Sequence, residues 1–209
     1  MSEVLLEASS LYCERDDRVL FSQLNLQIRP GTLIRVAGPN GTGKTTLLRI
    51  LAGLSSFYEG RLLWQGRPLW QVRESYLANL LFLGHRPAIT PSLTPLENLA
   101  AFTGVRRRNT RAELLDALAA AGLEHFEDIP AHHLSAGQQR RIALARLYLS
   151  TAPLWILDEA FTAIDRDGVR ALEALLRARV DAGGAVILTT HHELSLPGCE
   201  IITLGEDGL

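Results

Sequence analysis

The chain has 209 residues, with 23 acidic and 21 basic side chains and a formal net charge of −2. This length allows one sizeable core with a subdomain, and the balanced charge does not indicate nucleic-acid binding. The N-terminus has no basic-then-apolar signal segment, and no apolar run approaches the ~20 residues that a membrane helix needs. Because the two cysteines, Cys13 and Cys199, also fit a reducing compartment, we expect a soluble cytosolic protein. Peripheral attachment to a membrane through a partner remains open.

The first part of the chain predicts several short strands. Residues 4–11 alternate loosely between apolar and polar side chains and residues 24–28 alternate clearly, with a charged turn predicted over residues 13–18. Pro30 and Gly31 then turn the chain into an apolar strand at residues 33–37. A helix over residues 47–52 should end at Gly53, and further short strands are expected at residues 60–66 and 80–83.

From about residue 90 to residue 149 the pattern is helical. Thr94 and Glu97 form a capping-box pattern, with Pro95 at the first helical position, and residues 110–113 repeat the pattern at a second helix that Gly122 ends. An arginine run at residues 106–108 lies between these helices. A solvated face is the simpler interpretation of this run, and contact with acidic groups of a partner or of lipid heads is the alternative.

The last part of the chain returns to strands. Apolar strands are predicted at residues 154–157 and 185–189, with an amphipathic helix at residues 169–180 between them and a last strand at residues 201–204. Strands that alternate with helices predict an α/β fold with a mostly parallel sheet. We expect a single domain over residues 1–209, in which residues 1–88 and 151–209 form the core and about 89–150 form a helical subdomain.

A glycine-rich loop follows the predicted strand at residues 33–37 and precedes a helix. It fits the Walker A pattern G-x-x-x-x-G-K-[ST] at every fixed position, with the sequence Gly38-Pro39-Asn40-Gly41-Thr42-Gly43-Lys44-Thr45-Thr46. Such glycines let the backbone wrap around an anion, and the helix N-terminus adds partial positive charge. Lys44 should reach the β- and γ-phosphates of a nucleotide, and the Thr45 hydroxyl should ligate Mg²⁺.

Two acidic residues end the predicted strand at residues 154–157. Asp158 is placed to hold the Mg²⁺ shell, which is the Walker B role. Glu159 is placed to accept a proton from a water that attacks the γ-phosphate. Acids at a strand end are weak evidence alone, but they gain weight downstream of a Walker A motif.

A second motif precedes the helix predicted at residues 136–149. Leu134-Ser135-Ala136-Gly137-Gln138 resembles the LSGGQ signature of the ATP-binding-cassette (ABC) family, with Ala136 in place of the first glycine. In physical terms it is a helix N-terminus led by Ser135, which offers N–H groups and a hydroxyl to an anion. The same residues also predict an ordinary N-capped helix that packs Ile142, Leu144 and Leu147.

The resemblance covers the whole chain and implies a P-loop NTPase fold, with a mostly parallel sheet core, an antiparallel β edge and a helical subdomain. In the family two cassettes meet head to tail, so that each signature faces the Walker A motif of the other copy across ATP. A homodimer is therefore implied, in which Ser135, Ala136, Gly137 and Gln138 contact ATP. Residues 162–165, ending at Asp165, resemble the D-loop, and His191 resembles the switch histidine that contacts the γ-phosphate.

Three positions depart from the family pattern. His85 stands where the family usually has the Q-loop glutamine, as judged by its spacing from residues 93–98. Ala160 replaces the usual proline after the catalytic glutamate. The adenine-stacking aromatic is unclear: counting back from residues 24–26 places Arg15 there, with Tyr12 nearby, and a guanidinium plane can stack on adenine.

Several further strings narrow the resemblance to ATPase subunits of the cytochrome c maturation, or haem exporter, system; they lie at residues 63–66, 83–87, 94–99, 134–141 and 161–165. This resemblance implies docking on transmembrane subunits of the CcmB type, with CcmC- and CcmD-type subunits, at the cytoplasmic face of the inner membrane. Haem and a haem chaperone would then be indirect partners, because nothing in the chain predicts a haem site.

Two alternatives remain. One is the ATPase subunit of another ABC transporter, such as an importer or a drug exporter. The other is a soluble ABC switch protein in translation or DNA repair, which the chain disfavours because it has neither a second cassette nor a long coiled coil.

Overall fold

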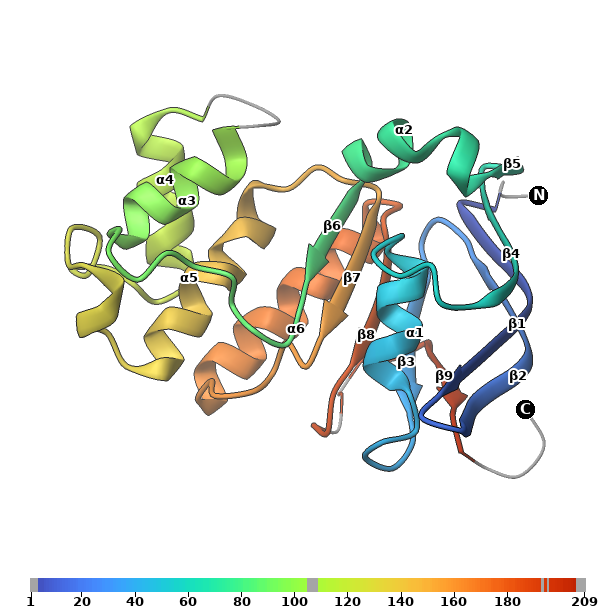
Figure 1. Cartoon of the computed structure of the whole chain (residues 1–209). Coiled ribbons are helices and arrows are strands. Elements are labelled where there is room, and N and C mark those ends of the chain that lie inside the picture. The colour runs from blue at the N-terminus through green and yellow to red at the C-terminus, as the bar shows by residue number, and fades with distance from the viewer. Residues whose placement is uncertain (1–3, 105–108, 193, 195, 206–209) are drawn as a thin grey trace. The chain divides into compact units, whose positions relative to one another are not determined.

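The computed structural model describes residues 4–104, 109–192, 194 and 196–205, so the arginine run at residues 106–108 lies outside the described residues. The chain divides into two compact units (Figure 1). The first comprises Met1–Phe82, Ala152–Glu159 and Leu176–Leu209, and the second comprises Leu83–Thr151 and Ala160–Leu175.

A mostly parallel sheet forms the centre of the first unit. Among the described residues it has five strands in the order β6 (Leu80–Leu83), β7 (Leu154–Asp158), β8 (Ala185–Thr189), β3 (Leu33–Ala37) and β9 (Cys199–Thr203). The last four of these pair in parallel. Strands β7 and β8 are buried along their whole length, as expected for a parallel sheet with both faces covered. The strands predicted at residues 33–37, 80–83 and 185–189 have the predicted bounds.

An antiparallel sheet contains the remaining described strands, in the order β2-β1-β4-β5. Their bounds are β1 (Leu6–Arg15), β2 (Arg18–Ile28), β4 (Glu59–Trp64) and β5 (Arg67–Pro68). The charged turn predicted over residues 13–18 is wrong in extent. Cys13 is buried and pairs with Phe21, so only Asp16 and Asp17 form the turn, both with the positive φ that a two-residue hairpin favours.

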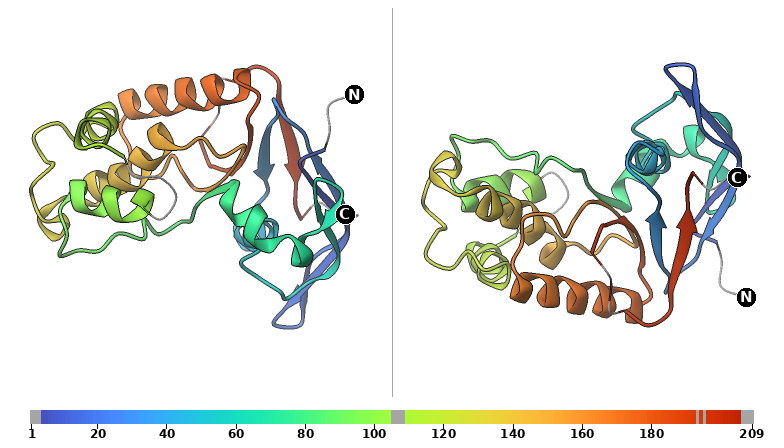
Figure 2. Two further views of the ribbon diagram at one scale, coloured as in Figure 1. Left: turned by 90° about the horizontal axis from the view of Figure 1, so that it is seen from above. Right: turned by 90° about the horizontal axis from the view of Figure 1, so that it is seen from below.

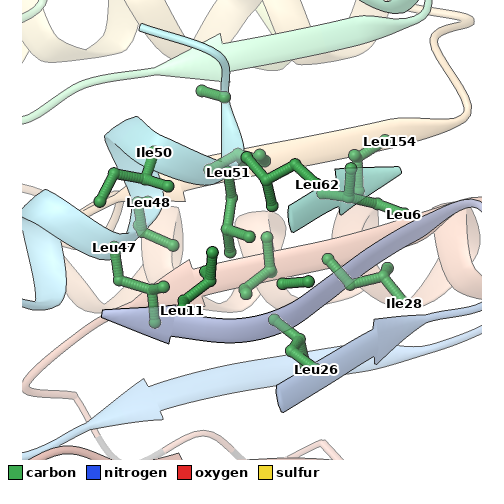
Figure 3. Close-up of a cluster of buried hydrophobic side chains, with 14 of the residues drawn as sticks. Leu6, Leu11, Leu26, Ile28, Leu47, Leu48, Ile50, Leu51, Leu62 and Leu154 are labelled. Atoms are coloured by element: carbon green, nitrogen blue, oxygen red, sulfur yellow. The ribbon is translucent and has the colours of Figure 1, made fainter. Parts of the chain in front are cut away.

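Helix α1 (Lys44–Leu51) packs between these two sheets. Its side chains Leu47, Leu48, Ile50 and Leu51 are buried in one cluster with residues of β1, β2, β4 and β7 (Figure 3). The 3₁₀ turn η1 (Leu69–Gln71) and helix α2 (Arg73–Ala78) were not predicted. The buried Tyr76 of α2 lies edge-on to Trp64, with ring centroids 5.1 Å apart, and its hydroxyl donates to the Leu51 carbonyl.

Helices form the second unit: α3 (Pro95–Gly104), α4 (Arg111–Ala120), the 3₁₀ turn η2 (Ala131–His133), α5 (Ala136–Leu149) and the start of α6 (Arg166–Asp181). Helices α3, α4 and α5 lie side by side around a shared apolar core (Figure 2). The two predicted capping boxes are confirmed, because Thr94 and Glu97, and likewise Thr110 and Glu113, exchange side-chain to backbone hydrogen bonds. Helix α5 has the predicted bounds.

Candidate nucleotide-binding site

The glycine-rich loop connects β3 to α1 through backbone conformations that favour glycine. Gly38, Gly41 and Gly43 have φ values of 134°, 82° and 94°. A Cβ atom added at Gly38 would lie 2.4 Å from the carbonyl oxygen of Leu204, so the loop passes close to the segment after β9. Glycine therefore adopts these turns at the lowest cost, and at Gly38 a side chain would also meet backbone.

The Lys44 side chain reaches back across this loop. Its Nζ donates to the carbonyl oxygens of Gly38 at 2.7 Å and Pro39 at 2.9 Å. The buried Thr42 hydroxyl donates to the same Pro39 carbonyl at 2.9 Å. The ammonium group and the N-terminus of α1 thus both lie at the glycine loop.

We expect Gly38→Ala to destabilise the nucleotide-free chain more than Gly41→Ala. Both substitutions force alanine into a positive-φ conformation, which costs roughly 1–2 kcal/mol. Only the Gly38 variant also meets backbone, because no atom lies within 4 Å of a Cβ at Gly41. Thermal unfolding without nucleotide should therefore show about a 2–8 °C loss for Gly41→Ala and a larger one for Gly38→Ala; equal losses would contradict this.

The carboxylate of Asp158 meets two hydroxyl groups from other elements. Its Oδ1 accepts from Thr45 Oγ1 at 3.2 Å and from Thr189 Oγ1 at 2.7 Å. Asp158 is 1% exposed and Thr189 is 0% exposed. The structure therefore brings together the predicted Mg²⁺ ligands, Thr45 and Asp158, and adds Thr189, for which the sequence analysis predicted no role.

The predicted general base lies at the next position. Glu159 has a positive φ of 53°, which is uncommon for a residue other than glycine, and its backbone N–H donates to Thr189 Oγ1 at 2.9 Å. Its Oε1 lies 3.5 Å from Nε2 of His191, the predicted switch histidine. The Glu159 side chain is 15% exposed, whereas that of His191 is 64% exposed, so the pair opens to solvent on the histidine side.

The signature residues lie at the N-terminus of α5, in the second unit. Ser135 is the N-cap: its Oγ accepts from the Gln138 backbone N–H, and Gln138 Oε1 accepts from the Ser135 N–H. Ser135 and Ala136 are exposed. A Cβ at Gly137 would lie 2.8 Å from the carbonyl oxygen of Ala163, so glycine here permits close approach of the predicted D-loop.

Asp165 ends the predicted D-loop and directly precedes α6. Its carboxylate accepts from the Gly168 backbone N–H at 2.9 Å and from Arg141 at 2.7 Å. These two hydrogen bonds, that from Gly168 first, lower the pKa of Asp165 below its ordinary value. Arg141 also donates to the Gly122 carbonyl, so one side chain of α5 joins the D-loop to the end of α4.

His85 is exposed and lies just after β6. Its backbone carbonyl, and that of Gly84, accept from Nη1 of Arg140 at 3.1 and 2.9 Å. Arg140 is on α5 and is 4% exposed. No role was predicted for Arg140, although its spacing from Leu144 and Leu147 places it on the buried face of the helix.

The two candidates for adenine stacking lie on β1. Arg15, at the tip of the β1–β2 hairpin, is exposed and lies 3.5 Å from the Asp16 carboxylate. The Tyr12 hydroxyl donates to Glu14. The same hairpin reaches the glycine loop through Leu20, whose Cβ would be 3.0 Å from a Cβ at Gly43. A stacking role for Arg15 stays a prediction.

Comparison with known proteins places this site in a family. The model of the ABC transporter family matches residues 21–162, and the chain belongs to this family of ATP-binding ATPases. It is 53% identical over 194 residues to "Cytochrome c biogenesis ATP-binding export protein CcmA" of Hahella chejuensis (strain KCTC 2396), covering 93% of this chain and 92% of that protein. The protein of the same name from Escherichia coli (strain K12) is 54% identical over 197 residues, 94% of each chain.

A solved structure supports the fold. The dimeric post-hydrolysis state of the ATP-binding cassette MJ0796 bound to ADP and Pi superposes with a TM-score of 0.82, covering 95% of this chain and 94% of that chain at 24% identity. The predicted fold, a P-loop ABC domain with a parallel sheet core, antiparallel strands and helices, is thereby confirmed.

Proposed function

We propose that this chain is the ATP-hydrolysing subunit of an ABC transporter complex that acts in cytochrome c biogenesis. Hydrolysis would be coupled to haem export or to release of a haem-loaded chaperone. The observation that carries this proposal is the 53% identity, over 93% of the chain, to a protein named as a cytochrome c biogenesis ATP-binding export protein.

The side-chain oxygen atoms at Asp158 would suit Mg²⁺, and the neighbouring glycine loop would suit the phosphates of a nucleotide. Mg²⁺ prefers hard oxygen ligands, and Thr45 Oγ1 and Asp158 Oδ1 are two such atoms, 3.2 Å apart at the start of α1 and the end of β7. When bound, the ion would neutralise charge on the β- and γ-phosphates. Lys44 and the backbone N–H groups of the loop would hold the phosphates themselves, through residues Gly38, Pro39, Asn40, Gly41, Thr42, Gly43, Lys44, Thr45 and Thr46.

The reaction itself would be carried by Glu159. Its carboxylate would accept a proton from the water that attacks the γ-phosphate, which is general base catalysis. His191, 3.5 Å from this carboxylate, would hold the base in place and contact the γ-phosphate. Ala160, which is fully buried, follows the base without an assigned role.

Completion of the site requires a second copy of the chain. The MJ0796 cassette that superposes on this chain is described as a dimer. In the corresponding homodimer, Ser135, Ala136, Gly137 and Gln138 would present the N-terminus of α5 to ATP held by the partner's glycine loop, because a helix N-terminus favours anions. Asp165 of the D-loop would lie in the same interface.

Residues 1–209 would form one ABC ATPase domain, with a catalytic core at 1–88 and 151–209 and a helical subdomain at about 89–150. The complex would include permease subunits of the CcmB type, with CcmC- and CcmD-type subunits, and the chain would lie on the cytoplasmic face of the inner membrane. Within the described part of the chain, no helix is both long and apolar enough to cross a bilayer.

A deletion and complementation experiment tests the proposed function. Cells that lack this chain should lose haem-stained c-type cytochromes, and the wild-type chain should restore them while Lys44→Ala should not. Purification of a tagged copy from membranes should recover transmembrane subunits of the Ccm type. Normal c-type cytochromes in the deletion strain would refute the proposal.

His85 should act in communication with the membrane partner and should not ligate the metal. Imidazole nitrogen is a poor ligand for Mg²⁺ compared with oxygen. We expect His85→Gln to keep ATPase activity, because it restores the group usual in the family, and His85→Ala to weaken coupling more than nucleotide binding. ATP affinity, ATPase rate with and without the membrane subunits, and haem delivery should be compared for both variants. Unchanged coupling in His85→Ala would leave His85 as a spacer only.

A further inference from the structure

A buried threonine at the end of β8 contacts both acids of the candidate site. Strand β8 lies between β7, which carries Asp158, and β3, which leads into the glycine loop (Figure 1). In the parallel register Thr189 pairs with Asp158 on one side and with Val36 on the other. Residues paired in this way direct their side chains to the same face of the sheet, so the Thr189 hydroxyl lies beside the Asp158 carboxylate.

The Thr189 hydroxyl makes two hydrogen bonds with complementary roles. It donates to Asp158 Oδ1 at 2.7 Å, and it accepts from the backbone N–H of Glu159 at 2.9 Å. An N–H group can only donate, so the single hydroxyl hydrogen is directed to the carboxylate. Thr189 Oγ1 therefore holds both the side chain of Asp158 and the main chain of Glu159.

Packing alone does not require a hydroxyl at this position. The other four residues of β8 are alanine, valine, isoleucine and leucine. These four residues and Thr189 are all fully buried. Valine has the shape of threonine and an equally good strand propensity, so a purely structural position would accept it. Buried hydroxyl groups are retained where they are hydrogen-bonded, and here both partners belong to the site.

The position of the Glu159 side chain depends on this contact. Its φ of 53° is a conformation that residues other than glycine adopt at a cost, and the bond from its N–H to Thr189 holds the peptide that enters this turn. Since threonine is restricted at χ1, it is a stiff support for the peptide. The Glu159 carboxylate starts from this peptide, so the position of the general base follows from it.

We propose that Thr189 is a positioning residue for ATP hydrolysis, which holds the Asp158 carboxylate and the Glu159 main chain in their working geometry. This inference rests on the proposed ATPase function and deepens it. Thr189 would not touch the nucleotide. It would act through the two acids, and its loss should therefore slow turnover while leaving ATP binding nearly unchanged.

The test compares Thr189→Val, which removes the hydroxyl at constant shape, with Thr189→Ser, which keeps it. Because small misplacements of a catalytic group can cost about 10²-fold in rate, we expect Thr189→Val to lower kcat by about 10–100-fold. Its KM for ATP should stay within about 3-fold of wild type. Thr189→Ser should stay within about 3-fold of wild type in both constants.

Further variants separate positioning from stability. Ile187→Val removes one methylene from the same buried strand, and it should lower the unfolding temperature with kcat unchanged. If Thr189→Val does not fold, Thr189→Ala against Thr189→Ser asks the same question, because these side chains differ only in the oxygen. Adding Thr189→Val to Glu159→Gln should change turnover by less than about 2-fold if Thr189 acts mainly through Glu159.

Three results would overturn the inference: a Thr189→Val variant with near-normal kcat, a Thr189→Ser variant as slow as Thr189→Val, or a loss confined to ATP affinity. Failure of the proposed function would look different, because the wild-type chain itself would then lack ATPase activity.

Discussion

Glu159→Gln is expected to bind ATP normally, to lose most hydrolysis and to accumulate as an ATP-bound dimer. Removal of a general base typically lowers the rate by about 10²–10⁴-fold. The amide also removes a negative charge beside the γ-phosphate, so the bound state should gain stability while its breakdown slows. Turnover, ATP affinity and particle size in the presence of ATP measure the three expectations.

Glu200→Gln is the matched control for this variant. Glu200 lies exposed on β9, outside the candidate site, and the substitution makes the same chemical change. It should leave turnover unchanged. Near-normal turnover in Glu159→Gln would refute the assignment of the general base, and a loss of ATP binding would indicate a role in affinity instead.

Mixed dimers of Lys44→Ala and Ser135→Arg subunits should recover activity that neither variant has alone. If each ATP lies between the glycine loop of one copy and the signature of the other, a mixed dimer combines both defects in one site and leaves the second site intact. Random mixing at equal amounts makes half of the dimers mixed, so about a quarter of the wild-type activity is expected if sites act independently.

The helix cap needs its own control, because Ser135 also begins α5. Ser135→Asp keeps an N-cap residue of equal quality but places a carboxylate where the partner's phosphates are expected. It should unfold like wild type and still lack ATPase activity. Full activity in the separate variants, or no recovery in mixtures shown to contain mixed dimers, would contradict the head-to-tail arrangement.

Local signals allowed a large part of the fold to be predicted. The strands at residues 33–37, 80–83 and 185–189 have their predicted bounds. Each is an apolar run ended by glycine or a polar residue, and this signal depends only on residues that are close in the sequence. The capping boxes at Thr94 and Thr110 were predictable for the same reason, since each joins residues three positions apart.

Elements that depend on distant partners were missed or misplaced. Helix α2 begins after Val72, which makes no side-chain cap hydrogen bond, and Tyr76 is buried beside Trp64, so packing rather than local pattern accounts for this helix. The turn at residues 13–18 was predicted too long for a similar reason. Burial of Cys13 and its pairing with Phe21 extend β1 into a charged segment.

The same distinction between local signals and distant contacts applies to the candidate site. The glycine loop, the acids Asp158 and Glu159 and the signature helix could be predicted from the sequence, because each is a contiguous motif whose chemistry follows from its own residues. The contacts that support them could not be predicted in this way. Thr189 meets Asp158 across 31 positions of sequence, and Arg140 meets His85 across 55. Neither contact leaves a local pattern, since each arises from strand order and helix packing that bring distant residues together.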